Sequence, residues 1–406
     1  MLLPLMFHLR LQYFLNYAVN GCLIPFMSIY FQQMHLDNMQ IGMVMGVASL
    51  AVVLSPVLVT LIADTHLDGR KMLAGLLMLT AVSLIVLPLY GTFLAILCGW
   101  LMTNIVQIPV NPLQDGINFA IQEERGRQGL AVVAFHRVRV WGTIGYIVPG
   151  LALYLLVRRT QDVTVVLYLA AGFAFAAGLN SLMLPSIGAR DMSRERKLPT
   201  VEAARVLFGR KMLILCIASF LLQMAAACYY SFYPVYLTKG LGISKEWSAM
   251  IMNIGVLGEI LFMLAFGRLM AFFGPRRFLL IGTAVILVRM TLLAAVANPY
   301  VAIGTQVCHG AMVLVLQVGP IVLLNSMGEA RFRHSLQGLF AMLVIGGGRI
   351  VGNFAAGPIA RYGYNAAYWW AAGLVLVAGL LLAVGYHPQP AVATVTAAEP
   401  DEAVAE

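Results

Sequence analysis

The sequence predicts an all-α membrane protein with about twelve transmembrane helices, arranged as two pseudo-symmetric six-helix bundles. Hydrophobic residues make up 61% of the 406-residue chain and charged residues only 11%, whereas a soluble domain carries about 25% charged residues. The apolar residues gather in segments of about 20, which is the length that crosses a bilayer as a helix. One long hydrophilic stretch near the middle divides these segments into two sets.

Each apolar segment is predicted to be helical, because a backbone inside lipid must satisfy its own hydrogen bonds. Short polar connections separate consecutive segments. The predicted spanning helices lie near 11–33, 40–63, 72–90, 93–120, 131–157, 163–187, 212–238, 247–272, 278–297, 300–325, 336–360 and 365–386.

The longest internal hydrophilic stretch lies between the sixth and seventh predicted helices. It is basic, contains Pro199, and includes a segment, Val201–Phe208, that we expect to form a short amphipathic helix at the membrane surface. The predicted organisation is therefore an N-terminal bundle (1–187), a cytoplasmic linker (188–211), a C-terminal bundle (212–386) and a disordered cytoplasmic tail (387–406).

The formal net charge of +9 could suggest a nucleic-acid partner, but the placement of the basic residues argues against one. Most of the 26 Lys and Arg residues fall in loops on the same side of the membrane as the N-terminus. Cytoplasmic loops are enriched in Lys and Arg, so both termini are predicted to be cytoplasmic. We expect a multi-pass protein of the plasma (bacterial inner) membrane that is a monomer and binds no nucleic acid.

Two loops about 200 residues apart resemble each other, as in transporters built from repeats. The loop after the second predicted helix contains Asp64, Gly69, Arg70 and Lys71, and the loop after the eighth contains a glycine followed by arginines at 274–277. Glycine permits a tight turn and arginine anchors a loop to headgroups. An ordinary cytoplasmic loop would explain the basic residues but not Asp64, so we predict a conformational role for these four residues.

The fourth predicted helix carries a polar stripe. Its members are spaced 3, 4, 4 and 3 residues apart, which puts them on one helix face. Such a stripe either lines a cavity or forms hydrogen bonds to a neighbouring helix, and we favour the cavity. The stripe consists of Asn104, Gln107, Asn111, Asp115 and Asn118.

Four further helices contribute candidate substrate-binding residues. Arg139 and Tyr146 in the fifth helix are seven residues apart and share a face; Arg139 could pair with Asp115 or with a substrate carboxylate. Tyr229 and Tyr230 in the seventh helix could stack on an aromatic or sugar ring, or belong to an interfacial aromatic belt. Asn20 in the first helix and Arg349 in the eleventh complete the set.

Three ionisable residues lie far from the ends of three successive apolar segments: Glu259, Arg289 and His309. A charge at bilayer depth costs roughly 2.5–3.5 kcal/mol, so it is rare unless it faces a protein interior or a water-filled cavity. A carboxylate, a guanidinium and an imidazole together can take up, hold and release a proton. We predict a proton-coupling site; the alternative is a structural ion-pair network between helices.

These motifs together resemble a major facilitator superfamily transporter, most closely the branch of the phenylpropionate permease and more distantly the lactose permease family. The resemblance covers nearly the whole chain. The segments that carry it are Asn20–Phe26, Asp64–Lys71, Pro112–Asp115, Arg137–Gly142, Tyr229–Tyr236, Gly258-Glu259, Val288-Arg289 and Cys308-His309.

By this resemblance, Asp115 and Arg139 would bind substrate, Tyr146 would occupy the position of a ring that stacks on sugar, and the 259–289–309 network would couple transport to protons. Met312 stands where the lactose permease has an essential carboxylate. The helix 7 carboxylates that face a helix 11 lysine in the lactose permease are also missing here. Arg349 could therefore meet an anionic substrate.

The predicted function is secondary active transport: proton-coupled symport of a small organic solute by alternating access, with an aromatic or carboxylated compound favoured and a sugar or nucleoside as the alternative. We expect no metal and no cofactor besides the coupling proton. A non-transporting membrane sensor is less favoured because the tail is short. A membrane enzyme is disfavoured because the sequence has no metal-ligand spacing, nucleophile elbow or phosphate-binding glycine loop.

Overall fold

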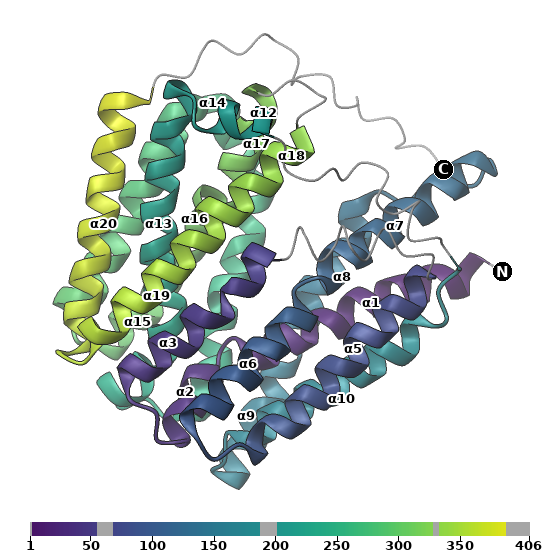
Figure 1. The fold of residues 1–406 in the computed structure, drawn as a ribbon, viewed down its shortest axis with the longest axis horizontal. Helices are drawn as coiled ribbons and strands as arrows, with labels where there is room; N and C mark the ends of the chain where they lie inside the picture. The colour runs from purple at the N-terminus through teal and green to yellow at the C-terminus, as the bar shows by residue number, and fades with distance from the viewer. Residues whose placement is uncertain (1, 55–67, 187–200, 328–332, 387–406) are drawn as a thin grey trace.

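The computed structural model describes residues 2–54, 68–186, 201–327 and 333–386, and they are almost entirely helical. The first half of the chain supplies the purple to blue helices of Figure 1. These are α1 (Leu2–Leu23), α2 (Met27–Gln33), α3 (Asn38–Ala48), α5 (Gly69–Val86), α6 (Phe93–Gln107), α7 (Val110–Arg127), α8 (Phe135–Ile147), α9 (Pro149–Thr160) and α10 (Thr164–Ser181).

The second half supplies the teal, green and yellow helices. These are α12 (Val201–Leu207), α13 (Arg210–Val235), α14 (Ser248–Ala295), α15 (Pro299–Gly304), α16 (His309–Val313), α17 (Gly319–Met327), α18 (Arg333–Leu339), α19 (Gly347–Ala360) and α20 (Tyr364–Gly385). Helix α12 confirms the short helix predicted in the linker, whereas the tail predicted from residue 387 onward lies outside the described residues.

Helix α14 contains two of the predicted segments. It breaks at Gly274, which has the left-handed φ of 71° that a residue without a Cβ adopts readily. The hydroxyl of Tyr236, which precedes α14, donates to the carbonyl oxygen of Leu293 near the far end of α14 at 3.1 Å. The chain has therefore reversed direction at Gly274 and returned to the side from which α14 begins.

The described residues contain nine helical stretches that are long and apolar enough to cross a membrane, or ten if the bent pair α1–α2 counts as one span. One of the nine, Lys245–Ala295, holds both arms of α14, and the segment predicted at 40–63 is described only as Asn38–Leu54. The fold is that of an all-α multi-pass membrane protein, as predicted; the number of twelve helices stays a prediction.

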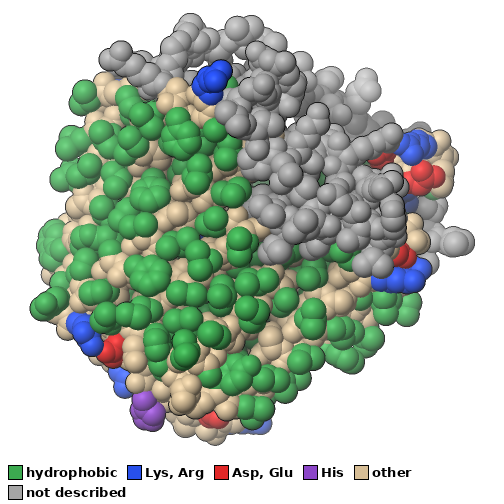
Figure 2. Space-filling model, in the orientation of Figure 1, with side chains coloured by type: hydrophobic (Ala, Val, Ile, Leu, Met, Phe, Trp, Pro, Cys, Tyr) green, Lys and Arg blue, Asp and Glu red, His purple; other side chains and the backbone are tan. Residues whose placement is uncertain are grey.

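The surface agrees with a membrane location. Hydrophobic side chains cover most of the face shown in Figure 2, and the charged side chains visible there lie near its margins. Large apolar residues are widely exposed, for example Leu264 at 78% and Leu94 at 67%. A soluble monomer rarely exposes apolar patches of this extent, whereas lipid solvates them.

The two halves form separate groups of helices in Figure 1, with α3 packed against α19 between them. Within the first half, α1 packs between α8 and α10; within the second, α13 packs against α19 and α20. The halves meet at the end of the molecule that carries the α2–α3 and α19–α20 connections. The domain boundaries at 187, 211 and 386 remain predictions.

Candidate functional site

A cavity of about 650 Å³ lies between the two halves and is lined by residues from both. This volume falls within the range of about 300–1,000 Å³ that is typical of small-molecule sites. Most of the predicted substrate-binding and coupling residues line it. They are Asn20, Asn111, Arg139 and Tyr146 from the first half, and Tyr230, Glu259, His309 and Arg349 from the second.

The wall from the first half is built by α1, α3, α6, α7 and α8. The guanidinium carbon of Arg139 lies 3.9 Å from the centre of the Tyr17 ring, so a cation–π contact holds this arginine against α1. Helices α1 and α8 can approach closely because Gly145 has no side chain. A Cβ at this position would lie only 2.1 Å from the carbonyl oxygen of Phe14. This close approach places Tyr17, Arg139 and Tyr146 at the edge of one cavity.

Arg289 is completely buried behind the wall of the second half. One terminal nitrogen donates to the hydroxyl oxygen of Tyr229 at 2.6 Å and to Oε1 of Gln306 at 3.0 Å. The guanidinium also lies 4.1 Å from the centre of the Tyr229 ring. The other terminal nitrogen contacts Sδ of Met312 at 3.6 Å. Neutral groups thus surround this charge.

His309 connects the buried guanidinium to the cavity. Nη1 of Arg289 lies 3.4 Å from Nδ1 of His309, and an arginine can only donate. Nδ1 therefore accepts, which puts the proton of a neutral imidazole on Nε2. Nε2 is 4.0 Å from Oε2 of Glu259. Arg289, His309 and Glu259, the three predicted coupling residues, thus follow one another in a row of contacts. The carboxylate of Glu259 lies on the cavity side.

Three predicted substrate-binding residues lie behind the cavity wall instead of on it. Within the described residues, neither Gln107, Asp115 nor Tyr229 lines the cavity. Gln107 donates to Asn16 at 3.2 Å, and Asp115 accepts from the Tyr13 hydroxyl at 2.6 Å. These contacts fix α6 and α7 to α1. Substrate binding by Gln107, Asp115 and Tyr229 stays a prediction.

The sequence analysis missed several lining residues, among them Tyr17, Trp100 and Thr143. Each is a residue type that is common in apolar helices, so its presence gave no signal. Thr143 could have been found by spacing, because it lies four residues after Arg139 and therefore on the same face of α8.

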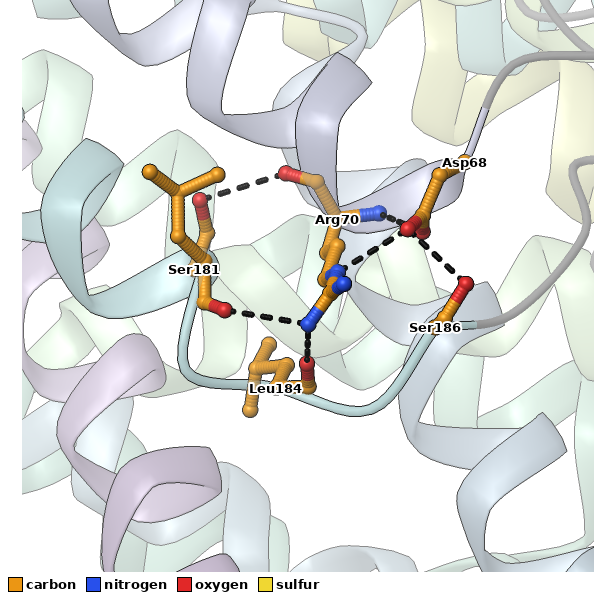
Figure 3. Close-up of polar contacts among 6 residues, drawn as sticks. Asp68, Arg70, Ser181, Leu184 and Ser186 are labelled. Atoms are coloured by element: carbon orange, nitrogen blue, oxygen red, sulfur yellow. Dashed lines mark hydrogen bonds and ion pairs between the residues drawn. The ribbon is translucent and has the colours of Figure 1, made fainter.

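The loop before α5 is described from Asp68 onward (Figure 3). Asp68 caps α5 and accepts from the Nε of Arg70 at 2.9 Å and from the Ser186 hydroxyl at 2.8 Å. Arg70 also donates to the carbonyl oxygens of Leu182 and Leu184. The hydrogen bonds from Arg70 and Ser186 lower the pKa of Asp68 against the opposing effect of its partial burial, so the carboxylate stays ionised.

The loop residues thus tie the start of α5 to the end of α10. Gly69 is buried beneath this contact, Lys71 is exposed, and Asp64 lies outside the described residues. In the described part of the chain, the acidic partner of Arg70 is Asp68. The conformational role of Asp64 stays a prediction.

The geometry is that of a solute pathway between two helical bundles, and comparison with known proteins identifies the family. The sequence profile of the MFS_1 like family matches residues 6–372. The chain belongs to this family. Its membership confirms the resemblance to the major facilitator superfamily and makes the protein a secondary transporter rather than an enzyme.

Related proteins refine this result. The chain is 26% identical to YegT of Escherichia coli K12, a candidate nucleoside transporter, over 84% of this chain and 83% of that protein. It is 22% identical to the nucleoside permease NupG of the same organism over 93% of both chains. The crystal structure of NupG superposes with a TM-score of 0.84 over 95% of this chain and 100% of that chain, at 21% identity, and so shares its fold.

Proposed function

We propose that this MFS_1 like protein is a proton-coupled nucleoside symporter that works by alternating access. The observation that carries the proposal is the cavity between the halves, which combines aromatic rings and amides with a carboxylate connected to a buried guanidinium. The related proteins YegT and NupG carry the names of nucleoside transporters, which favours a nucleoside over the aromatic solute of the phenylpropionate branch as the substrate. We further propose that the protein is a monomer of the bacterial inner membrane with both termini cytoplasmic.

The lining chemistry fits a nucleoside. Tyr17, Trp100, Tyr146 and Tyr230 offer rings on which a planar base can stack. Amide side chains on α1, α6 and α7 offer both donors and acceptors, which suit ribose hydroxyls and the polar edge of a base. A fully hydrophobic solute would leave these polar groups without partners, at a cost of about 1–3 kcal/mol for each one that is desolvated.

Proton coupling would use Glu259. Its carboxylate is on the cavity side, where a proton can arrive through water, and Nε2 of His309 lies 4.0 Å away. A proton on Glu259 would remove the attraction to the imidazole N–H and to Arg139, which interacts electrostatically with Glu259 from the opposite half. Protonation would therefore loosen a contact between the halves while solute is bound, and this links the two events.

Uptake by the purified protein in proteoliposomes tests the proposal. Radiolabelled uridine should accumulate when an inward proton gradient is imposed, and adding uridine without a gradient should make the external medium more alkaline. Uridine uptake that is insensitive to a protonophore would contradict proton coupling. Absence of uridine uptake, with uptake of 3-phenylpropanoate, would replace the nucleoside by the aromatic carboxylate as substrate class.

A further inference from the structure

We propose that Arg349, together with Asn353, forms an anion subsite within the cavity, so that the preferred substrate is a nucleoside that carries a carboxylate. This inference rests on the proposed nucleoside transport and adds the charge class of the substrate. It starts from the one lining arginine that the coupling network does not use.

Arg349 lies on α19 and lines the cavity from the second half. Within the part of the chain that the structure describes, no carboxylate forms an ion pair with it. The other lining arginine, Arg139, is held by the Tyr17 ring and interacts with Glu259. The charged lining side chains, apart from the imidazole, are thus two guanidinium groups and one carboxylate, which leaves a positive charge at Arg349.

Arg349 differs from Arg289 because its guanidinium faces the open cavity, whereas that of Arg289 is completely buried. A structural arginine at membrane depth is expected to be surrounded by acceptors, as Arg289 is by Tyr229 and Gln306. Arg349 has no such hydrogen bonds to described residues and faces the open cavity instead. A guanidinium kept in this position is available to a ligand, because no acceptor in the described part of the chain occupies its donors.

Asn353 adds a second donor beside Arg349. The two residues are four apart on α19, so they lie on one face, one turn from each other. The side-chain oxygen of Asn353 accepts from the Ser231 hydroxyl at 2.6 Å. That contact orients the amide and leaves its N–H groups to donate into the cavity, which Asn353 also lines. A fixed amide donor next to a free guanidinium is a suitable site for an anion.

The charge balance favours a carboxylate over a phosphate. A carboxylate carries one negative charge and matches the planar fork of a guanidinium with two parallel hydrogen bonds. A phosphate monoester would bring close to two negative charges, which exceeds the one uncompensated guanidinium and would lie in the same cavity as Glu259. The base and ribose would still have the aromatic and amide residues of the first half available to them.

Binding measurements on the purified full-length protein test the subsite with three matched probes: uridine, 5-carboxyuridine and 5-carbamoyluridine. The last two differ in charge and hardly in shape. The variants are Arg349→Gln, Arg349→Lys and, as a matched control, Arg159→Gln, which removes an exposed arginine at the end of α9. Calorimetry gives the Kd of each pair, and thermal unfolding of every variant reports that it has folded.

The wild type should bind 5-carboxyuridine about tenfold more tightly than 5-carbamoyluridine, which is the size of effect expected for hydrogen bonds to a charged group. Arg349→Gln should bind the acid and the amide with about the same Kd, so that this preference is lost. Arg349→Lys should keep part of the preference, and Arg159→Gln all of it.

Equal binding of the acid and the amide by the wild type would overturn the anion subsite and leave nucleoside transport intact. A preference for the acid that survives Arg349→Gln would also overturn it, because the anion would then be bound elsewhere. Binding of 3-phenylpropanoate without binding of any of the three nucleosides would overturn the nucleoside proposal and this inference with it.

Discussion

At the scale of single residues, the informative feature is how the chain stabilises a fully buried guanidinium without an adjacent carboxylate. Arg289 makes its hydrogen bonds to a phenol, an amide and an imidazole. These acceptors keep the charge in place without neutralising it. The positive charge therefore still acts on His309, whose other nitrogen faces Glu259. We expect changes at Arg289 to reach Glu259 through the imidazole of His309.

The phenol of Tyr229 should contribute more to stability than that of Tyr233. Tyr229→Phe removes an acceptor from a buried charged donor, and we expect a loss of about 1.5–3 kcal/mol in the free energy of unfolding. Tyr233 donates to the carbonyl oxygen of Ala302 at 3.0 Å. Tyr233→Phe breaks only a bond between neutral groups and should cost about 0.5–1.5 kcal/mol. Thermal unfolding of the two purified variants compares them, and equal losses would argue against a charged Arg289.

Glu259→Gln should separate solute exchange from proton coupling. Glutamine keeps the size and hydrogen-bonding capacity of the side chain but cannot take up a proton. We expect uridine counterflow to persist within about threefold of the wild-type rate, since it needs no net proton movement, and gradient-driven accumulation to fall by about tenfold or more. Both are measured in proteoliposomes.

Glu124→Gln is the matched control for this variant. Glu124 lies near the end of α7 with 55% of its side chain exposed, so its replacement should leave both activities unchanged. If Glu259→Gln drives accumulation as well as the wild type does, another group must carry the proton.

The sequence could predict the site residues that are out of place in lipid and missed those that are not. Glu259, His309 and Arg349 stood out because a charged or titratable group in an apolar segment is rare, and all three line the cavity. Tyr17 belongs to a type that is common in membrane helices, so nothing marked it. Asp115 stood out equally, but its partner, the hydroxyl of Tyr13, is a hundred residues away in sequence and could not be inferred.

At the scale of elements, the polar stripe of the fourth predicted helix divides at a helix break. The structure ends α6 at Gln107 and begins α7 at Val110, because Pro109 and Pro112 cannot donate backbone hydrogen bonds. Asn104 and Asn111 reach the cavity. The other three members contact side chains of α1: Gln107 donates to Asn16, Asp115 accepts from the hydroxyl of Tyr13, and Asn118 donates to that same hydroxyl. The prediction of one continuous lining face assumed a regular helix across this break.

Close packing of α1 on α8 should depend on Gly145. Gly145→Ala would place a methyl group 2.1 Å from a backbone oxygen of α1, and backbone cannot move aside as a flexible side chain can. We expect a loss of about 1–3 kcal/mol in stability from overpacking, measured by thermal unfolding in detergent. Because Arg139 and Tyr146 lie on the same helix, the variant should also weaken uridine binding.

Gly172→Ala provides the control for this substitution. Gly172 is also inside a helix, α10, but nothing lies within 4 Å of the position that its Cβ would take. Alanine is favoured over glycine in a helix by roughly 0.5–1 kcal/mol, so this variant should be as stable as the wild type or slightly more stable. A similar loss in both variants would attribute the effect to the helix rather than to its contact with α1.

At the scale of the whole molecule, the hydrogen bonds between the two halves that involve described residues gather at one end. Asn38 donates to the carbonyl oxygen of Ala360, Ser248 to that of Pro25 and Asn253 to that of Ile147. The connections at this end are the ones predicted to lie outside the cytoplasm. Composition and periodicity predicted two bundles, but they carry no information on which end is closed, because that depends on contacts between residues hundreds of positions apart.

An ion pair at this closed end joins the halves directly: Nη2 of Arg361 lies 2.6 Å from Oδ2 of Asp37. The backbone N–H of Gln40 and the Arg361 guanidinium hold the pKa of Asp37 below its ordinary value of 3.8. A lowered pKa means that the ionised pair stabilises this state above about pH 4 and loses that contribution as the pH falls further. Near neutral pH the ion pair is intact and helps to hold the two halves together at this end.

We expect Asp37→Asn to shift the population towards the state in which this end is open. Both side chains are about half exposed, at 54% and 45%, so the pair is worth only about 0.2–1 kcal/mol. The ratio of the two states should change by about 1.4- to fivefold. Spin labels at exposed positions of the two halves, such as Arg159 and Tyr362, would report the change as a larger population with a long label-to-label distance. Asparagine still caps α3, so helix loss cannot explain the shift.

The exchanged pair Asp37→Arg with Arg361→Asp should restore the wild-type distribution. An unchanged distribution in Asp37→Asn would mean that apolar packing of α3 on α19, rather than the ion pair, keeps this end closed.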